Sequence, residues 1–282
     1  MTEGVRSPSS GRSRPDLATV AGLLLALGGI VGGLLIEGGR IKDVAQFTAA
    51  LIVLGGSTGA VMVSTPLSAL KNAAGRLKDV ILDSNPDLNG VIDEIIAFAT
   101  QARKHGLVSL EQIADGVEDP YLRKALSLAI DGADLQEIRD ILQLEIDLED
   151  RRAEAGAKVF ESAGGYAPTI GIIGAVLGLI QVMQHLANID EVGRGIAVSF
   201  VATVYGVASA NLLFLPAANK IKARAEARLQ RKELILEGVL GIAEGLNPKL
   251  IRSKLEAYTS GRAKPKPMRA TRQAPNFESP AA

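Results

Sequence analysis

Cysteine and tryptophan are absent from the 282 residues, and histidine occurs only at His105 and His185. Without cysteine the chain has no disulfide bond, no thiolate nucleophile and no cysteine-ligated metal. Two histidines make a multi-histidine metal centre improbable. We therefore expect neither a metal nor another cofactor.

An excess of charge of either sign is also missing. Lys and Arg together number 31, as do Asp and Glu, so the formal net charge is zero and gives no indication of nucleic-acid binding. The charges are segregated, however, because long charge-free runs alternate with densely charged ones. With 47% hydrophobic residues and a mean hydropathy of +0.21, this pattern is typical of a membrane protein.

Sequence motifs of common enzymes are missing as well. The chain has no P-loop, no G-x-G-x-x-G after a strand, no G-x-S-x-G and no H-E-x-x-H. We therefore expect that the protein is not an enzyme.

Four charge-free windows are long enough to cross a bilayer, which takes about 20 apolar residues in a helix. They are Leu17–Ile36, Val44–Leu70, Ser162–Ile189 and Gly195–Asn219. The first is too long for a signal-peptide core and is not followed by a cleavage site. Pro66 marks the expected end of the second span, because the residue before a proline avoids the α region. The sequence predicts an all-α integral membrane protein with four transmembrane helices.

Lysine and arginine predict the orientation. Few of them lie in the turns after spans one and three, whereas the segments after spans two and four are rich in them. Both termini and a helical domain between spans two and three are therefore expected in the cytoplasm. The expected parts are an N-terminal tail (1–16), a transmembrane hairpin (17–65), a cytoplasmic helical domain (66–160), spans three and four (161–219), cytoplasmic C-terminal helices (220–258) and a disordered tail (259–282).

Capping signals divide the cytoplasmic segments into helices. The signals are a turn at Asn85-Pro86-Asp87, a stop at His105-Gly106, a capping box of Ser109 with Gln112, a start at Asp119-Pro120, a start at Asp134 with Glu137, and a start at Asn247-Pro248. The helix after Asp134 is expected to continue into span three, and span four to continue to about Gly245.

Small residues form one stripe on each of the last two spans. Pro168, Gly171, Ala175 and Gly178 share a face of span three, and Ser199, Thr203, Gly206 and Ala210 share a face of span four. Such stripes either let helices pack closely or line a narrow wet path, and the residues alone leave both open.

No span carries a carboxylate near its centre; Glu37 and Glu161 lie only at span ends. A coupled ion path normally needs an ionisable group at depth. Either the protein moves no ions or a partner supplies the acid. Thr203, the hydroxyl nearest the middle of span four, either bonds back to its own helix or faces such an acid.

Residues Ser162–Ile180 (SAGGYAPTIGIIGAVLGLI) strongly resemble the third span of MotA-type flagellar stator subunits, members of the MotA/TolQ/ExbB superfamily. Phe200–Asn211 and Phe214–Lys220 resemble the fourth span. The motifs Glu237-Gly238, Glu244-Gly245 and Asn247-Pro248 resemble the C-terminal segment of that family. The resemblance covers essentially residues 15–258.

This resemblance implies a homopentamer in the bacterial inner membrane around a MotB-type partner, whose single helix supplies an essential aspartate. Ion flow through the joint channel would then drive torque on the rotor's switch-complex protein. The resemblance also implies roles for individual residues: conformational hinges at Pro168 and Pro216, an ion pathway at Thr203 and Ala175, and a rotor interface at Arg103 and Glu111. Alanine at 175, where sodium-driven relatives tend to carry threonine, implies that the coupling ion is a proton.

Two other functions are weighed against this one. An ExbB- or TolQ-like subunit that energises outer-membrane processes would resemble spans three and four, but it would have one helix before the cytoplasmic domain rather than a hairpin. A small-solute transporter would need a polar midplane site, broken spans or an internal repeat, none of which the sequence shows.

Overall fold

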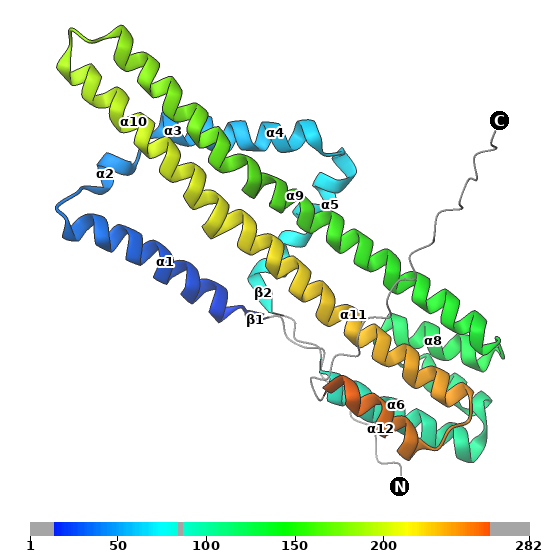
Figure 1. The fold of residues 1–282 in the computed structure, drawn as a ribbon. Coiled ribbons are helices and arrows are strands. Elements are labelled where there is room, and N and C mark those ends of the chain that lie inside the picture. The colour runs from blue at the N-terminus through cyan, green and yellow to red at the C-terminus, as the bar shows by residue number, and fades with distance from the viewer. Residues whose placement is uncertain (1–13, 84–86, 260–282) are drawn as a thin grey trace, which may run out of the picture.

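The computed structural model describes residues 14–83 and 87–259. In this part of the chain, two long helical segments run antiparallel along the whole molecule (Figure 1). One is α9 (Leu135–Gln184), a single helix of 50 residues. The other comprises α10 (Ile189–Ala208), the π-helical turns η3 (Ser209–Phe214) and α11 (Leu215–Ala243). The prediction that span three belongs to one long helix, and that span four continues as a helix to about Gly245, is thus confirmed.

Within the described residues, four helical segments are long and apolar enough to span a membrane, as predicted. The first is α1 (Leu17–Ile36). The second runs from Phe47 to Ser64 and consists of α3 (Phe47–Ala50), the π-helical turns η1 (Leu51–Gly55) and α4 (Gly56–Ser64). The third and fourth lie within α9 and α10–α11.

The predicted second window, Val44–Leu70, is longer than the helix, but the end predicted for the span at Pro66 is confirmed. Val44 belongs to the short helix α2 (Ile41–Val44), and the helix breaks at Ala45 and Gln46. At the other end α4 stops at Ser64, because Thr65 before Pro66 takes an extended conformation with φ −131° and ψ 130°. The break at Gln46 is bridged by Tyr205, whose hydroxyl donates to the Val44 carbonyl at 2.6 Å and accepts from the Gln46 amide at 3.3 Å.

Helix α1 is held at its N-terminal end rather than along its length. It buries no side chain, and a Cβ added at its glycines, Gly22, Gly28, Gly29, Gly32 and Gly33, would meet nothing within 4 Å. These glycines therefore make no close contact with another helix of the described chain. Asp16, 6% exposed, caps the helix by accepting from the amides of Ala18 and Thr19.

The Asp16 carboxylate also connects α1 to α11. Its Oδ2 lies 2.5 Å from Lys220 Nζ and 2.8 Å from an Arg224 guanidinium nitrogen. The hydrogen bond from Lys220 holds the pKa of Asp16 well below its usual range. A short antiparallel pair, β1 (Arg14–Pro15) with β2 (Leu82–Asp83), lies beside it; the sequence did not predict these strands.

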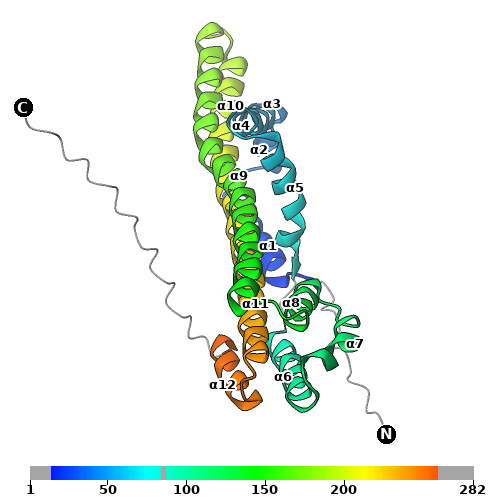
Figure 2. The ribbon, with the colours of Figure 1, turned by 90° about the vertical axis from the view of Figure 1, so that its right-hand side faces the viewer.

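A helical bundle forms one end of the molecule (Figure 2). It contains α6 (Leu88–His105), α8 (Pro120–Ile130) and α12 (Pro248–Thr259), packed on the ends of α9 and α11. The helix α5 (Leu67–Ile81) leads from span two to it. The largest wholly buried side chains of its core are Ile92, Ile95, Leu110, Leu122, Leu126, Ile138, Leu142, Leu234, Ile235, Leu240 and Ile251.

Most capping predictions in this bundle are confirmed. Asp119 accepts from the amides of Tyr121 and Leu122, Gly106 ends α6 with φ +80°, and Asn247 accepts from the amide of Lys249. Helix α9 begins after Asp134 as expected, although that side chain makes no capping hydrogen bond.

The capping box at Ser109 is wrong. Ser109 lies inside the 3₁₀ turn η2 (Leu107–Leu110), and its hydroxyl donates back to the Gly106 carbonyl at 2.6 Å before the short helix α7 (Glu111–Ala114) begins. The chain tightens directly after the positive φ of Gly106, so the hydroxyl bonds locally instead of capping. Asn85 and Pro86 of the predicted turn, and nearly all of both predicted tails, lie outside the described residues.

Candidate functional site

The two predicted stripes of small residues pack directly against each other. A Cβ added at Gly206 would lie 2.6 Å from the Ala167 carbonyl oxygen, and one at Gly171 would lie 2.9 Å from that of Ala202. Both distances are shorter than van der Waals contact, so the backbones of α9 and α10 meet where only glycine fits. Of the two possibilities that the sequence left open, close packing is the one observed for the seam itself.

Hydroxyl groups lie along this seam. Ser199 Oγ lies 2.8 Å from the Ala175 carbonyl oxygen and 3.0 Å from that of Gly195, and thus links α10 to α9. Thr203 Oγ1 donates to the Ser199 carbonyl at 3.3 Å, which is the back-bonding expected of a threonine in a helix. Thr203 nevertheless remains only half-buried. It is not enclosed between the two helices.

Span two covers one side of the α9–α10 pair. A Cβ on Gly56 would meet Ile170, and one on Gly174 would meet Ile52. On α10, Val201 and Ala202 pack with Ala49 and Val53 of the second span. These contacts define a covered side of the pair.

The predicted site residues Pro168, Ala175 and Thr203 lie on the opposite side. Successive helical residues are turned by about 100°. Around α9, Pro168 and Ala175 therefore lie across the Gly171 seam from the residues that face span two. Around α10, Thr203 lies across the Gly206 seam from Val201 and Ala202. Apolar side chains on this free side are exposed: Ile172 58%, Val176 51%, Phe200 71% and Val207 47%.

The described parts of the four spans contain no carboxylate beside Thr203. Glu161, at the end of span three, is paired with Lys222 at 2.5 Å. Glu191, at the start of α10, lies 3.4 Å from His185 at the far tip of the pair. Among the described residues no cluster of His, Cys, Asp or Glu could hold a metal ion.

The two predicted hinge prolines lie on segments that contact each other. Pro168 is inside α9, where its missing N–H leaves the Gly164 carbonyl without its helical donor. A Cβ at Gly164 would lie 2.7 Å from Leu215, the residue before Pro216. Pro216 itself directly follows the π-helical turns of η3. The sequence did not predict these widened turns, which are frequent at functional sites.

The predicted rotor residues Arg103 and Glu111 are in the bundle, away from Thr203. Arg103 is in the last turn of α6 and Glu111 begins α7. Both are exposed, and within the described chain neither has an ion-pair partner. The structure therefore places the predicted site residues in two separate regions.

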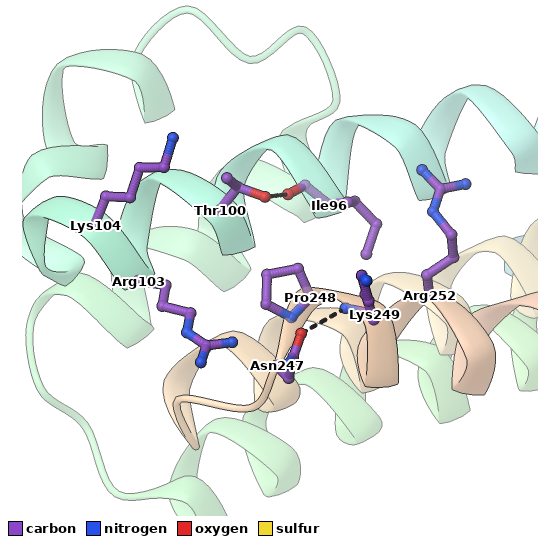
Figure 3. Close-up of a pocket in the computed structure, with 8 residues that line it drawn as sticks. All are labelled: Ile96, Thr100, Arg103, Lys104, Asn247, Pro248, Lys249 and Arg252. Atoms are coloured by element: carbon purple, nitrogen blue, oxygen red, sulfur yellow. Dashed lines mark hydrogen bonds between the residues drawn. The ribbon is translucent and has the colours of Figure 1, made fainter.

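A surface pocket of about 580 Å³ adjoins Arg103 (Figure 3). It lies between the end of α6 and the start of α12. Its lining residues are Ile96, Thr100, Arg103, Lys104, Asn247, Pro248, Lys249 and Arg252. The sequence did not identify Lys249 or Arg252, because α6 and α12 are far apart in the chain.

Two family models match this chain. A family model described as the MotA/TolQ/ExbB proton channel family matches residues 113–234, and one described as Motility protein A N-terminal matches residues 20–105. Motility protein A of Bacillus subtilis is 36% identical over 247 residues, covering 86% of this chain and 90% of the relative. The chain belongs to the MotA/TolQ/ExbB proton channel family.

A second relative, Motility protein A of Helicobacter pylori, is 37% identical over 243 residues, covering 86% of this chain and 95% of the relative. Among solved structures, that of C. jejuni MotAB superposes with a TM-score of 0.84 at 33% identity, covering 88% of this chain and 97% of that chain. As a member of the MotA/TolQ/ExbB family with four apolar helices, the chain is a multi-pass membrane protein.

Asp16 and Tyr205 each connect distant parts of the chain, and the sequence did not predict either contact. Asp16 directly precedes the first apolar run, which is an N-cap signal. Its cationic partners Lys220 and Arg224 could not be identified in the same way, because more than 200 residues separate them from it. The pairing of Tyr205 with the break at Gln46 likewise has no local signature.

Proposed function

We propose that the chain is a flagellar motor stator subunit that forms an ion channel with a MotB-type partner and converts ion flow into torque on the rotor. The observation that carries this proposal is the likeness to C. jejuni MotAB over 97% of that chain, at 33% identity. A family match to the N-terminal part of motility protein A, over residues 20–105, supports a MotA-type member rather than an ExbB- or TolQ-like one.

The partner would lie on the free side of the α9–α10 pair. Thr203 and Ala175 line the ion pathway there, and an aspartate on the partner's single helix supplies the carboxylate that the described spans lack. Support comes from the half-burial of both residues on the side that span two leaves uncovered. Five copies of the chain surround the partner, and the exposed apolar side chains of this side pack against the partner and neighbouring copies.

The orientation follows from the positive-inside rule. Residues 1–16, 66–160 and 220–282 lie in the cytoplasm, and the turns after spans one and three lie outside the bacterial inner membrane. This arrangement places the helical bundle, with Arg103 and Glu111, where the rotor's switch-complex protein can bind it. Pro168 and Pro216 act as hinges between the channel and this bundle.

The coupling ion in this proposal is the proton. Ala175 has no side-chain oxygen to replace the hydration of a sodium ion, whereas a proton can pass along water and a carboxylate.

A complementation experiment tests both the stator function and the identity of the coupling ion. The chain and its MotB-type partner are expressed in a motile bacterium from which the native stator genes have been deleted, and swimming is recorded with and without sodium. We expect swimming in both media. No swimming in either medium would contradict the stator function, and swimming only with sodium would contradict proton coupling alone.

A further inference from the structure

The pocket beside Arg103 has an unusual charge distribution. Four cationic side chains line it: Arg103 and Lys104 from α6, and Lys249 and Arg252 from α12. Among the described residues, the carboxylate paired with this set is Asp93, whose Oδ1 lies 2.7 Å from an Arg252 guanidinium nitrogen. Arg103, Lys104 and Lys249 make no ion pair in the described chain.

Helix polarity favours the charges of Arg103 and Lys104 but disfavours that of Lys249. Arg103 and Lys104 are in the last turn of α6, where a cation offsets the partial negative charge of the helix end. Lys249 is in the first turn of α12, whose N-terminus is itself partially positive and which has no acidic residue in that turn. Its charge therefore adds to the positive potential of the pocket.

The surroundings of the pocket suit a protein segment better than a free anion. Ile96 and Pro248 form an apolar floor between the cations (Figure 3). Interfaces between proteins combine such apolar anchors with charged rims. The chain's own residues 260–282 carry five Lys or Arg and one Glu, so their charge disfavours them as the occupant.

We propose that this pocket binds an acidic, partly apolar segment of the rotor protein, and that Lys249 and Arg252 of α12 take part in that contact together with Arg103. The inference rests on the proposed stator function and extends the rotor-binding surface from α6 to α12. Asp93 lowers the affinity of the pocket for this acidic segment, because its carboxylate neutralises Arg252.

Binding of the host's purified switch-complex protein to the full stator complex tests this inference. We expect Lys249→Glu to weaken binding about three- to tenfold, and the loss to shrink as salt is raised. Asp93→Asn should tighten binding, since it frees Arg252. Arg151→Glu, a charge reversal at an exposed arginine on α9 outside the pocket, is the matched control and should bind like the wild type.

Swimming of the same variants in the stator-deleted strain separates this inference from the proposed function. If the wild-type chain restores swimming while Lys249→Glu binds and swims like it, the inference is wrong and the stator function stands. Equal losses in Lys249→Glu and Arg151→Glu, tighter binding of Lys249→Glu, or displacement of the rotor protein by millimolar inorganic phosphate would also overturn the inference. If the wild-type chain itself restores no swimming, both proposals fail.

Discussion

Gly206 illustrates how a single residue determines the spacing of the two central helices. Its Cα faces the backbone of Ala167, Pro168 and Gly171, and an added Cβ would lie 2.6 to 3.2 Å from them. Backbone atoms cannot rotate away as a side chain can, so even one methyl group must push the helices apart.

We therefore expect Gly206→Ala to destabilise the protein by about 1–3 kcal/mol, the usual cost of overpacking. Thermal unfolding of the purified protein in detergent measures this. Gly75→Ala is the control, because a Cβ there meets nothing within 4 Å. An unchanged midpoint for Gly206→Ala would show that α9 and α10 are not in backbone contact.

Asp16 is the second residue whose role can be isolated. Its pKa is lowered in the folded protein, chiefly by the hydrogen bond from Lys220. The ionised carboxylate therefore stabilises the fold fully above the pKa of an unfolded aspartate, about 4, and progressively less as pH falls through the folded pKa.

Asp16→Asn removes this ionic contribution and leaves Lys220 and Arg224 without their carboxylate. We expect a loss of about 1–3 kcal/mol at neutral pH that narrows as the pH is lowered below about 4. Unfolding midpoints of both proteins between pH 7 and pH 3 give the comparison. If the difference in unfolding midpoint between the wild type and Asp16→Asn grew as the pH fell, the ionised Asp16 carboxylate would not be what stabilises the fold.

At the scale of helices, α9 contains Pro168 beside the π-helical turns that precede Pro216. The Gly164 carbonyl, which lacks its usual donor, lies at this point of contact. Pro168→Ala restores this backbone donor and should stiffen the helix.

If Pro168 is a hinge, Pro168→Ala should still co-purify with the partner. Swimming speed should fall at least about tenfold, because a stiffer α9 cannot bend between the channel and the bundle. Both readouts come from the same strain. Loss of co-purification would instead assign Pro168 a role in assembly.

Elements that depend on local chemistry were predictable, and those that depend on distant contacts were not. Charge-free runs gave four spans, and Asp119, Gly106 and Asn247 gave helix ends, because these residues act on neighbouring backbone. The widened turns at Leu51–Gly55 and Ser209–Phe214, and the break at Gln46, depend on packing against α9 and α10. Ser109 shows the limit of local signals, since a capping pattern was present but its hydroxyl bonds to Gly106.

The same division applies to the candidate site. Helical periodicity predicted that a stripe of small residues on span three and another on span four could pack against a helix, and the two stripes do meet at Gly171 and Gly206. The residues could not reveal that the two stripes meet each other at these glycines, nor that α12 contributes cations to the pocket near Arg103, because both facts require the tertiary structure.

At the scale of the whole molecule, two long helical segments join two regions. One is the apolar α9–α10 pair with Thr203 on its free side, and the other is the helical bundle with its exposed charged residues. The described spans contain no acid beside Thr203, so this chain alone should not conduct protons. Conduction should require the acid of the partner.

Proton flux into liposomes therefore tests the central claim most directly. The purified chain is reconstituted alone, with its MotB-type partner, and with a partner whose membrane aspartate is changed to asparagine. The account predicts flux only with the unaltered partner, and a further loss when Thr203→Val replaces the hydroxyl. Equal flux from the chain alone, or from the complex with the asparagine partner, would contradict it.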